Sequence, residues 1–128
     1  MQNVQKVFTL IELVVVIVLL GILGVTALAK FQDLSGEAQN AANAGVAAEL
    51  SSGSSINYAA YSLSTALGTP ITNLTSCPDA ATALMTLKPA GYNFNLSGAV
   101  NSCTAGTTFE CLVDGGGTAA SAIVLCTN

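Results

Sequence analysis

The chain of 128 residues is 52% hydrophobic and only 8% charged, with three basic residues, no histidine and a formal net charge of -4. It is too apolar to be disordered, because disorder requires low hydrophobicity and high charge. Nucleic-acid binding requires a clustered basic surface, which this composition does not provide. The absence of histidine excludes His-dependent catalytic triads and histidine metal sites, and the length suits one small domain.

The first predicted element is an apolar helix from Phe8 to Ala29, in which Glu12 is the single charged residue. A helix of this length covers about 33 Å, which is enough for the roughly 30 Å hydrocarbon core of a bilayer. A signal peptide is the alternative, but its apolar region is about 7–15 residues long and precedes a small-residue cleavage site. The lysine before the segment weakly favours a cytoplasmic N-terminus.

Glu12 is an unusual residue for such a segment. A carboxylate near the end of a membrane helix costs less than the roughly 2.5–3.5 kcal/mol of a charge at the bilayer centre, yet such residues are usually functional and paired. Three other interpretations are open: a place at the interface, a polar cavity, or a tolerated defect. No basic residue within the segment can pair with Glu12, so we expect its partner to be a chain terminus or another molecule.

The run FTLIELVVVIVLLGILG, which begins at Phe8, resembles the N-terminal signature of type IV pilins. The following residues, VTALAKFQDLSGEAQNAAN, resemble pilins of the mannose-sensitive haemagglutinin type. The resemblance implies that a prepilin peptidase cuts between Val7 and Phe8 and that the new Phe8 amine is N-methylated. It also implies that Glu12 meets the Phe8 ammonium of a neighbouring subunit in a filament. An unpaired carboxylate is costly in a low-dielectric filament core, whereas a paired one is tolerated.

Two positions depart from the pattern of that family. Val7 stands where the family nearly always has glycine, and we expect a β-branched residue to fit a peptidase pocket built for glycine poorly. Ala29 stands where the family typically has a helix-bending proline, so we expect a straighter helix there. Gly21 and Gly24 remain as weak points of the helix, each costing up to about 1 kcal/mol relative to alanine.

Beyond the apolar segment the helix is predicted to continue as an amphipathic helix over 31–67. No proline occurs before Pro70, and Gly68 followed by Pro70 forms a stop signal. The segment SSGSS predicts fraying or a break. Three-four spacing places these residues on one helix face: Phe31, Leu34, Ala38, Ala41, Gly45 and Ala48. The small residues suit close helix packing in a filament, but a plain alanine-rich helix gives the same pattern.

The remainder, 68–128, is predicted to form a globular head. A short helix is expected over 79–87, after Pro78. Strands are expected over 92–96, 107–113 and 119–126, with a glycine-rich turn between the last two. The fold class is therefore α+β: a long N-terminal helix, hydrophobic in its lower half and amphipathic in its upper half, packed on a small antiparallel sheet. The resemblance to pilins implies the same fold.

Four cysteines follow the apolar segment, and they predict two disulfides and an oxidising compartment. The alternative is four free or metal-binding thiols, but zinc sites usually show a close pair of cysteines, which this sequence lacks. Several connectivities are open. A pairing of Cys111 with Cys126 looks like the C-terminal cysteine hairpin of related pilins, and it leaves Cys77 with Cys103.

The resemblance to type IV pilins implies a structural subunit of a type IV pilus rather than an enzyme, and the features above agree with it. We expect a helical filament of identical subunits that serves adhesion, surface attachment or motility. Its other partners would be the inner membrane, the prepilin peptidase and the pilus assembly machinery, with no nucleic acid and no cofactor.

The leader would be 1–7 and the transmembrane or filament-core helix 8–30. The chain would pass from the inner membrane to a pilus on the cell surface. The alternative is a pseudopilin or minor pilin of a type II secretion or DNA-uptake system. A membrane-anchored enzyme and a single-pass anchor that never polymerises have less support from the sequence.

Overall fold

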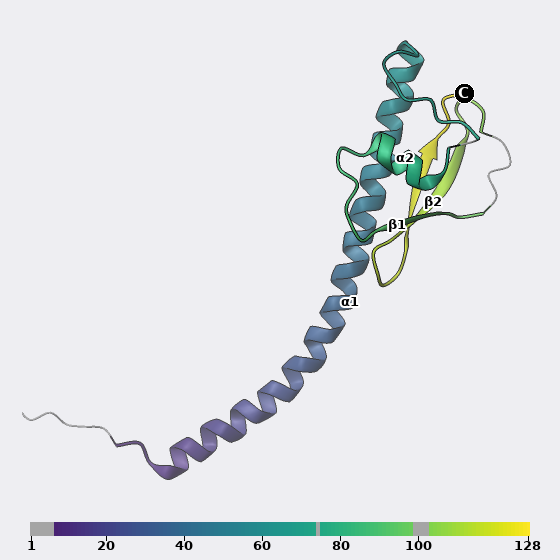
Figure 1. Cartoon of the computed structure of the whole chain (residues 1–128). Coiled ribbons are helices and arrows are strands. Elements are labelled where there is room, and N and C mark those ends of the chain that lie inside the picture. Colours follow the sequence, from purple (N-terminus) through teal and green to yellow (C-terminus); the bar gives the residue numbers. More distant parts are fainter. Residues whose placement is uncertain (1–6, 74, 99–102) are drawn as a thin grey trace, which may run out of the picture. The chain divides into compact units, whose positions relative to one another are not determined.

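The computed structural model describes residues 7–73, 75–98 and 103–128. Figure 1 shows the elements in chain order, namely α1 (Leu10–Leu63), α2 (Cys77–Leu84), β1 (Asn93–Leu96), β2 (Thr108–Asp114) and β3 (Ala120–Leu125). A long apolar helix with a small antiparallel sheet confirms the α+β class and matches the pilin fold. The chain divides into an N-terminal unit that ends at Gly36 and a head unit that begins at Glu37.

In the N-terminal unit, α1 begins directly after Thr9, which caps its first turn. The backbone N–H of Glu12 donates to Thr9 Oγ1 at 3.3 Å and to the Thr9 carbonyl oxygen at 3.1 Å. The helix then continues without a proline, and every residue from Val7 to Ala38 is exposed. The apolar surface of this stretch is therefore uncovered in the single chain.

In the head unit, α1 continues through the segment SSGSS, so the predicted fraying or break is wrong. The hydroxyls of Ser51 and Ser55 donate to carbonyl oxygens one turn earlier, at 2.9 Å and 3.0 Å. Ser54 is fully buried. A Cβ placed on Gly53 would lie 2.3 Å from the carbonyl oxygen of Leu84, so α1 and α2 touch here. Tertiary contacts override the low helix propensity of the segment.

The helix ends at Leu63, earlier than the predicted end near Leu67. Asn57 holds the chain that folds back after this end, because its Oδ1 accepts from the Thr69 N–H at 2.7 Å and its Nδ2 donates to the Thr69 carbonyl oxygen at 2.9 Å. Gly68 permits the close return, since a Cβ there would lie 2.8 Å from a backbone nitrogen of α1. The absence of a side chain at Gly68 therefore lets the chain pass close to α1 as it folds back.

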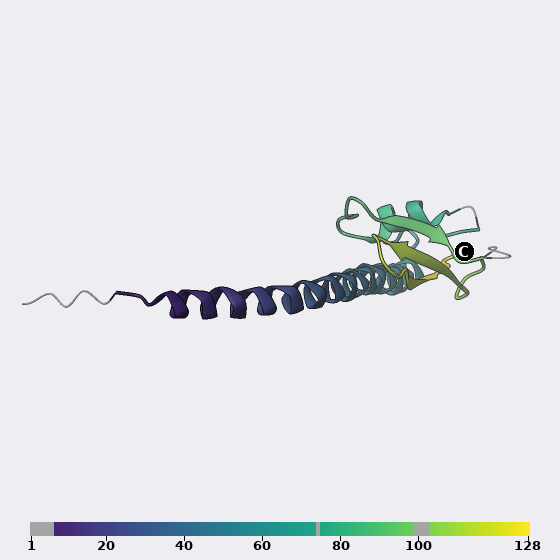
Figure 2. The same cartoon turned by 90° about the horizontal axis from the view of Figure 1, so that it is seen from below.

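The described sheet has three antiparallel strands in the order β1-β2-β3, and each strand lies close to its predicted range. Phe94 of β1 faces Val113 of β2, which faces Ala120 of β3. Figure 2 shows the sheet from a second direction, with α2 beside it. One face of the sheet packs inward, because β2 and β3 alternate between buried and more exposed residues.

The core of the head unit lies between α1, α2 and the inner face of the sheet. Its buried apolar residues in these elements are Ala47, Leu50, Cys77, Ala80, Ala81, Phe94, Cys111, Val113, Ala122 and Val124. The buried face of α1 consists of Asn43, Ala47, Leu50 and Ser54. The stripe predicted from three-four spacing is exposed, so the head covers a different face. That face includes an asparagine and a serine, which an apolar pattern cannot reveal.

The disulfides join Cys77 to Cys111 and Cys103 to Cys126, so the expected pairing of Cys111 with Cys126 is wrong. The register of the hairpin explains the difference, because Cys111 faces Ala122. The offset from Ala122 to Cys126 along a strand is roughly 13 Å at about 3.3 Å per residue. A disulfide spans Cα atoms no more than about 7 Å apart.

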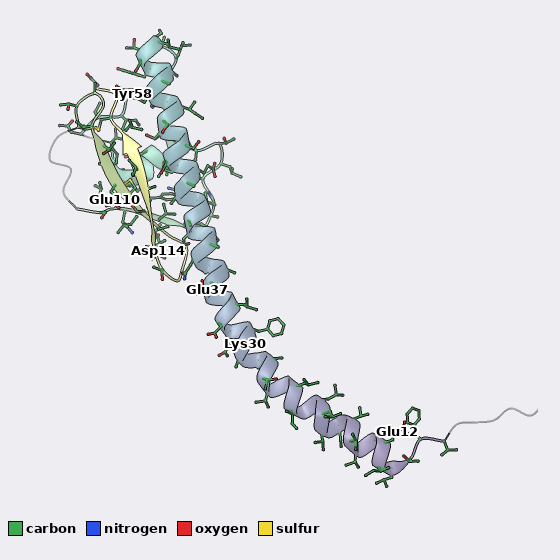
Figure 3. The ribbon with its side chains drawn as sticks, turned by 180° about the vertical axis from the view of Figure 1, so that it is seen from behind. Glu12, Lys30, Glu37, Tyr58, Glu110 and Asp114 are labelled. Atoms are coloured by element: carbon green, nitrogen blue, oxygen red, sulfur yellow. A yellow bond between two sulfur atoms is a disulfide. The ribbon has the colours of Figure 1, made fainter. Side chains whose placement is uncertain are left out.

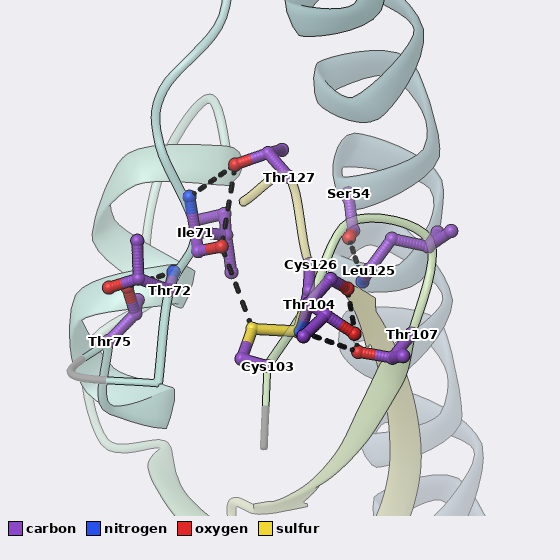
Figure 4. Close-up of a disulfide and its surroundings, with 10 residues drawn as sticks. All are labelled: Ser54, Ile71, Thr72, Thr75, Cys103, Thr104, Thr107, Leu125, Cys126 and Thr127. Atoms are coloured by element: carbon purple, nitrogen blue, oxygen red, sulfur yellow. Dashed lines mark hydrogen bonds between the residues drawn. A yellow bond between two sulfur atoms is a disulfide. The ribbon is translucent and has the colours of Figure 1, made fainter.

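Each disulfide joins two parts of the head that lie far apart in the sequence. One bridge ties the start of α2 to the middle strand at Cys111. The other bridge holds the end of the chain next to Ile71, as Figure 4 shows. There the Ile71 N–H donates to Thr127 Oγ1 at 2.7 Å, and the Thr127 N–H donates to the Ile71 carbonyl oxygen at 3.0 Å. The C-terminal residues are thereby held against the loop that precedes α2.

Candidate functional site

The start of α1 carries the residues to which the sequence assigns processing and assembly, and Figure 3 marks Glu12 there. Val7 and Phe8 precede the helix and are 86% and 77% exposed. Glu12 is exposed on the first turn of the helix. The structure thus brings the expected cleavage point and the acid together within one short, accessible stretch of chain.

Thr9 caps the helix beside Glu12, a role that the sequence analysis missed. A threonine three residues before a glutamate forms the capping-box pattern, in which the threonine side chain accepts from the backbone N–H of the glutamate. That hydrogen bond is present here between Thr9 Oγ1 and the Glu12 N–H. The Glu12 side chain also lies where the helix dipole favours a negative charge. Glu12 therefore supports the start of α1 as well as any contact with another molecule.

In the described part of the N-terminal unit, no cation lies close to Glu12. Lys30 is the one basic residue between positions 7 and 36. It lies roughly 27 Å further along the helix, at about 1.5 Å per residue. An ion pair requires a separation of about 4 Å, so Lys30 cannot neutralise Glu12 within one helix. The carboxylate is available to a positive charge from another source.

The surface around Glu12 is apolar and exposed. Large apolar side chains from Val7 to Leu28 are exposed, from 39% at Val14 to 86% at Val7. The helix contains a stretch with a mean hydropathy of 2.8, which makes it capable of crossing a membrane by length and composition. Burial of each such side chain is worth roughly 1.5–3 kcal/mol. The summed burial free energy of these side chains exceeds the roughly 5–15 kcal/mol that stabilises a typical domain. Lipid or other chains must therefore cover this surface.

Gly21 and Gly24 lie within this apolar segment. Nothing is within 4 Å of the place where a Cβ would lie on either residue, so no close contact inside the chain requires glycine. The helix remains regular through both glycines and through Ala29. Because each glycine weakens a helix by up to about 1 kcal/mol, these two positions are where α1 would unwind at the lowest cost.

The four cysteines have a different role from the residues of the N-terminal unit. All of them lie in the head unit and all are bonded in disulfides. Within the described ranges, no group of three or more His, Cys, Asp or Glu side chains is arranged to hold a metal ion. The cysteines act as structural cross-links of the head.

Comparison with known proteins identifies the N-terminal stretch. Residues 5–28 match the family profile described as the prokaryotic N-terminal methylation motif. The match includes Val7, Phe8 and Glu12 and most of the apolar segment. No curated protein and no solved structure matches the chain. The motif is typical of the signals of type IV pilin and pseudopilin precursors, so the chain carries a prepilin-type signal. Proteins with this signal are structural rather than enzymatic.

Proposed function

We propose that this chain is the structural subunit of a type IV pilus, a helical filament of identical subunits. The observation that carries the proposal is the exposed apolar part of α1, which has one acid on its first turn and lies within the methylation motif. Lipid covers this surface while the precursor is in the inner membrane. Neighbouring subunits cover it in the pilus at the cell surface.

In this proposal, processing supplies a positive charge that the described part of the N-terminal unit, from Val7 to Gly36, does not place beside Glu12. In this proposal the prepilin peptidase removes 1–7 by cutting between Val7 and Phe8, and the Phe8 amine is methylated. A free terminal amine is mostly protonated at neutral pH. The cut therefore places a cation at the start of the apolar segment, directly before the cap at Thr9.

In the filament, Glu12 of one subunit pairs with the Phe8 ammonium of a neighbour. A carboxylate removed from water without a partner is penalised by several kcal/mol, while a paired one is tolerated. The pair therefore acts mainly on register, because a subunit that docks out of place leaves both charges buried and unpaired. A single polar residue selects the register of a coiled coil in the same way. Apolar burial supplies most of the favourable free energy of assembly.

A pseudopilin or minor pilin is the second candidate, because both classes share the methylation motif. The two disulfides of the head favour a pilin over a pseudopilin, whose head often lacks the disulfide pair. Adhesion, surface attachment and motility are all compatible with the proposed filament.

Imaging of material sheared from the cell surface tests the proposal. Fibres composed mainly of this chain are the expected result, and intact-mass measurement of the same material should show a chain without 1–7, with one added methyl group and two disulfides. If the mature chain occurs only in the membrane fraction or as a trace component of other fibres, the major-subunit proposal is wrong.

A further inference from the structure

The last residue of β2, Asp114, is followed by Gly115, the first residue of the turn to β3. In an Asp–Gly dipeptide, the backbone nitrogen of the glycine can attack the side-chain carboxyl carbon of the aspartate and close a five-membered succinimide ring. Glycine hinders this attack least, because it has no Cβ and a permissive backbone. The attack requires the nitrogen to be free and to approach the carbon in a suitable direction at about 3–3.5 Å.

Asn43 of α1 engages the nitrogen that would have to attack. Its side chain is fully buried, and its Oδ1 accepts a hydrogen bond from the Gly115 N–H at 3.1 Å. Its Nδ2 donates to the carbonyl oxygens of Gly116 and Thr118, both at 2.8 Å. One side chain therefore holds three backbone groups of the turn. Figure 3 shows Asp114 at this end of the hairpin, beside α1.

The other parts of the dipeptide are held as well. Oδ1 of Asp114 accepts from the Gly116 N–H at 2.8 Å. The Gly115 carbonyl oxygen accepts from Nε2 of Gln39 at 2.7 Å. A Cβ on Gly115 would lie 2.5 Å from the ring of Tyr92, so the ring packs directly against this residue. The peptide cannot rotate toward the carboxyl carbon while these contacts persist.

We propose that Asp114–Gly115 is a latent isomerisation site and that Asn43 is the latch that keeps it closed. When the turn leaves α1, the Gly115 nitrogen loses its proton and bonds to the carboxyl carbon of protonated Asp114, and one water molecule leaves. Water then opens either carbonyl of the ring. One product is the original aspartate and the other is isoaspartate, so no oxidant or other reactant is needed.

Isoaspartate changes the turn permanently. Its backbone runs through the former side chain and contains one additional methylene group, so Gly115 is displaced relative to Asn43. The Gly116 N–H also loses its acceptor, since the side-chain carboxylate has moved to the α-carbon. A modified turn cannot dock on α1 with the contacts seen here. The modification therefore marks those head units whose hairpin has left the helix, and this inference does not depend on the proposed function.

The test measures isoaspartate at position 114 by peptide mapping with electron-transfer fragmentation. The full chain is incubated in detergent micelles at neutral pH, as the unchanged protein and as the variants Asn43→Ala and Asn57→Ala. Asn57 is the matched control, because it also uses both amide atoms to hold loop backbone, at Thr69. The reduced and denatured chain gives the isomerisation rate of Asp114 when the turn is not held against α1.

We expect slow isomerisation in the unchanged protein and in Asn57→Ala. The rate in Asn43→Ala should rise at least about tenfold, because the loss of three hydrogen bonds increases the open population by at least that factor. Equal rates in the unchanged and denatured chains would overturn the proposal, and so would equal rates in the two variants. Hydrogen exchange in the unchanged protein is an independent check that needs no variant. The Gly115 N–H should exchange slowly, and fast exchange would refute the latch.

Discussion

The hydroxyl oxygen of Ser54 in α1 accepts a hydrogen bond from the backbone N–H of Leu125 in β3 at 2.6 Å. One turn earlier, Ser51 accepts in the same way from the Ile123 N–H at 2.9 Å. Because β3 is an outer strand of the sheet, these N–H groups point away from β2. An outer strand with free donors is a template for pairing with another chain. Two serines of the helix thus satisfy donors that a further strand would otherwise bind.

Replacement Ser54→Ala should destabilise the head by about 1–3 kcal/mol, because it leaves the part-buried Leu125 N–H without an acceptor. The free energy of unfolding can be measured by urea titration of the full chain in micelles. Ser52→Ala is the control, since Ser52 is exposed, and it should change stability by less than about 0.5 kcal/mol. Equal losses in the two variants would contradict the role of Ser54.

Two glycines of α1 should respond to alanine with opposite signs. Gly53→Ala should lower the melting temperature, because its Cβ would lie 2.3 Å from the Leu84 carbonyl oxygen. Gly45→Ala should raise it, because nothing lies within 4 Å of that Cβ and alanine gains up to about 1 kcal/mol of helix propensity. Thermal unfolding followed by circular dichroism measures both. A stabilising Gly53→Ala would show that α1 and α2 do not touch at this point.

Replacement Glu12→Ala should leave the chain inserted in the membrane and sharply reduce the yield of fibres. The physical reason is that the Phe8 ammonium of a neighbour would then be buried without a counter-charge. Fibre yield is measured in sheared material and insertion in the membrane fraction. Asp33→Asn is the control, because it removes an acid that lies on the same helix beyond the apolar segment. Undiminished fibre yield from Glu12→Ala would argue against the pairing.

Replacement Val7→Gly should speed removal of the leader. In the proposed processing, a β-branched side chain lies directly before the cut, where the family resemblance implies a peptidase pocket shaped for glycine, and its branched Cβ needs more room. The fraction of processed chain over time, measured by intact mass in cells that express a prepilin peptidase, reports the effect. Val4→Gly serves as a control further from the cut. If Val7→Gly and the unchanged chain are processed at the same rate, Val7 is no obstacle.

The regular elements could be predicted from the sequence because their signals are local. The continuous apolar run, the absence of proline and the alternation in strands gave the long helix and the sheet, with ends displaced by a few residues. The helix was expected to begin at Phe8 and begins at Leu10; the capping pattern of Thr9 and Glu12 was the local signal that could have placed this start. The methylation motif lies in the same local stretch, which is why the candidate site was accessible to sequence reasoning.

Features that depend on tertiary register could not be predicted in the same way. The disulfide partner of Cys111 follows from its position opposite Ala122, and no local pattern fixes that alignment. The face of α1 that the head covers includes Asn43 and Ser54, which resemble surface residues until their backbone partners are known. Sequence patterns predict the burial of apolar side chains well. They do not predict which polar side chains are buried because they hydrogen-bond to backbone groups.

Within the described residues, the hydrogen bonds from α1 to the later parts of the head begin at Gln39 and extend to Asn57. A fragment that starts at Glu37 would therefore keep every one of these hydrogen bonds and both disulfides, and it would lack the apolar segment of α1. Such a fragment is suited to crystallisation and calorimetry in plain buffer. Its production would require export to the periplasm or oxidative refolding, since its cross-links form only where thiols are oxidised.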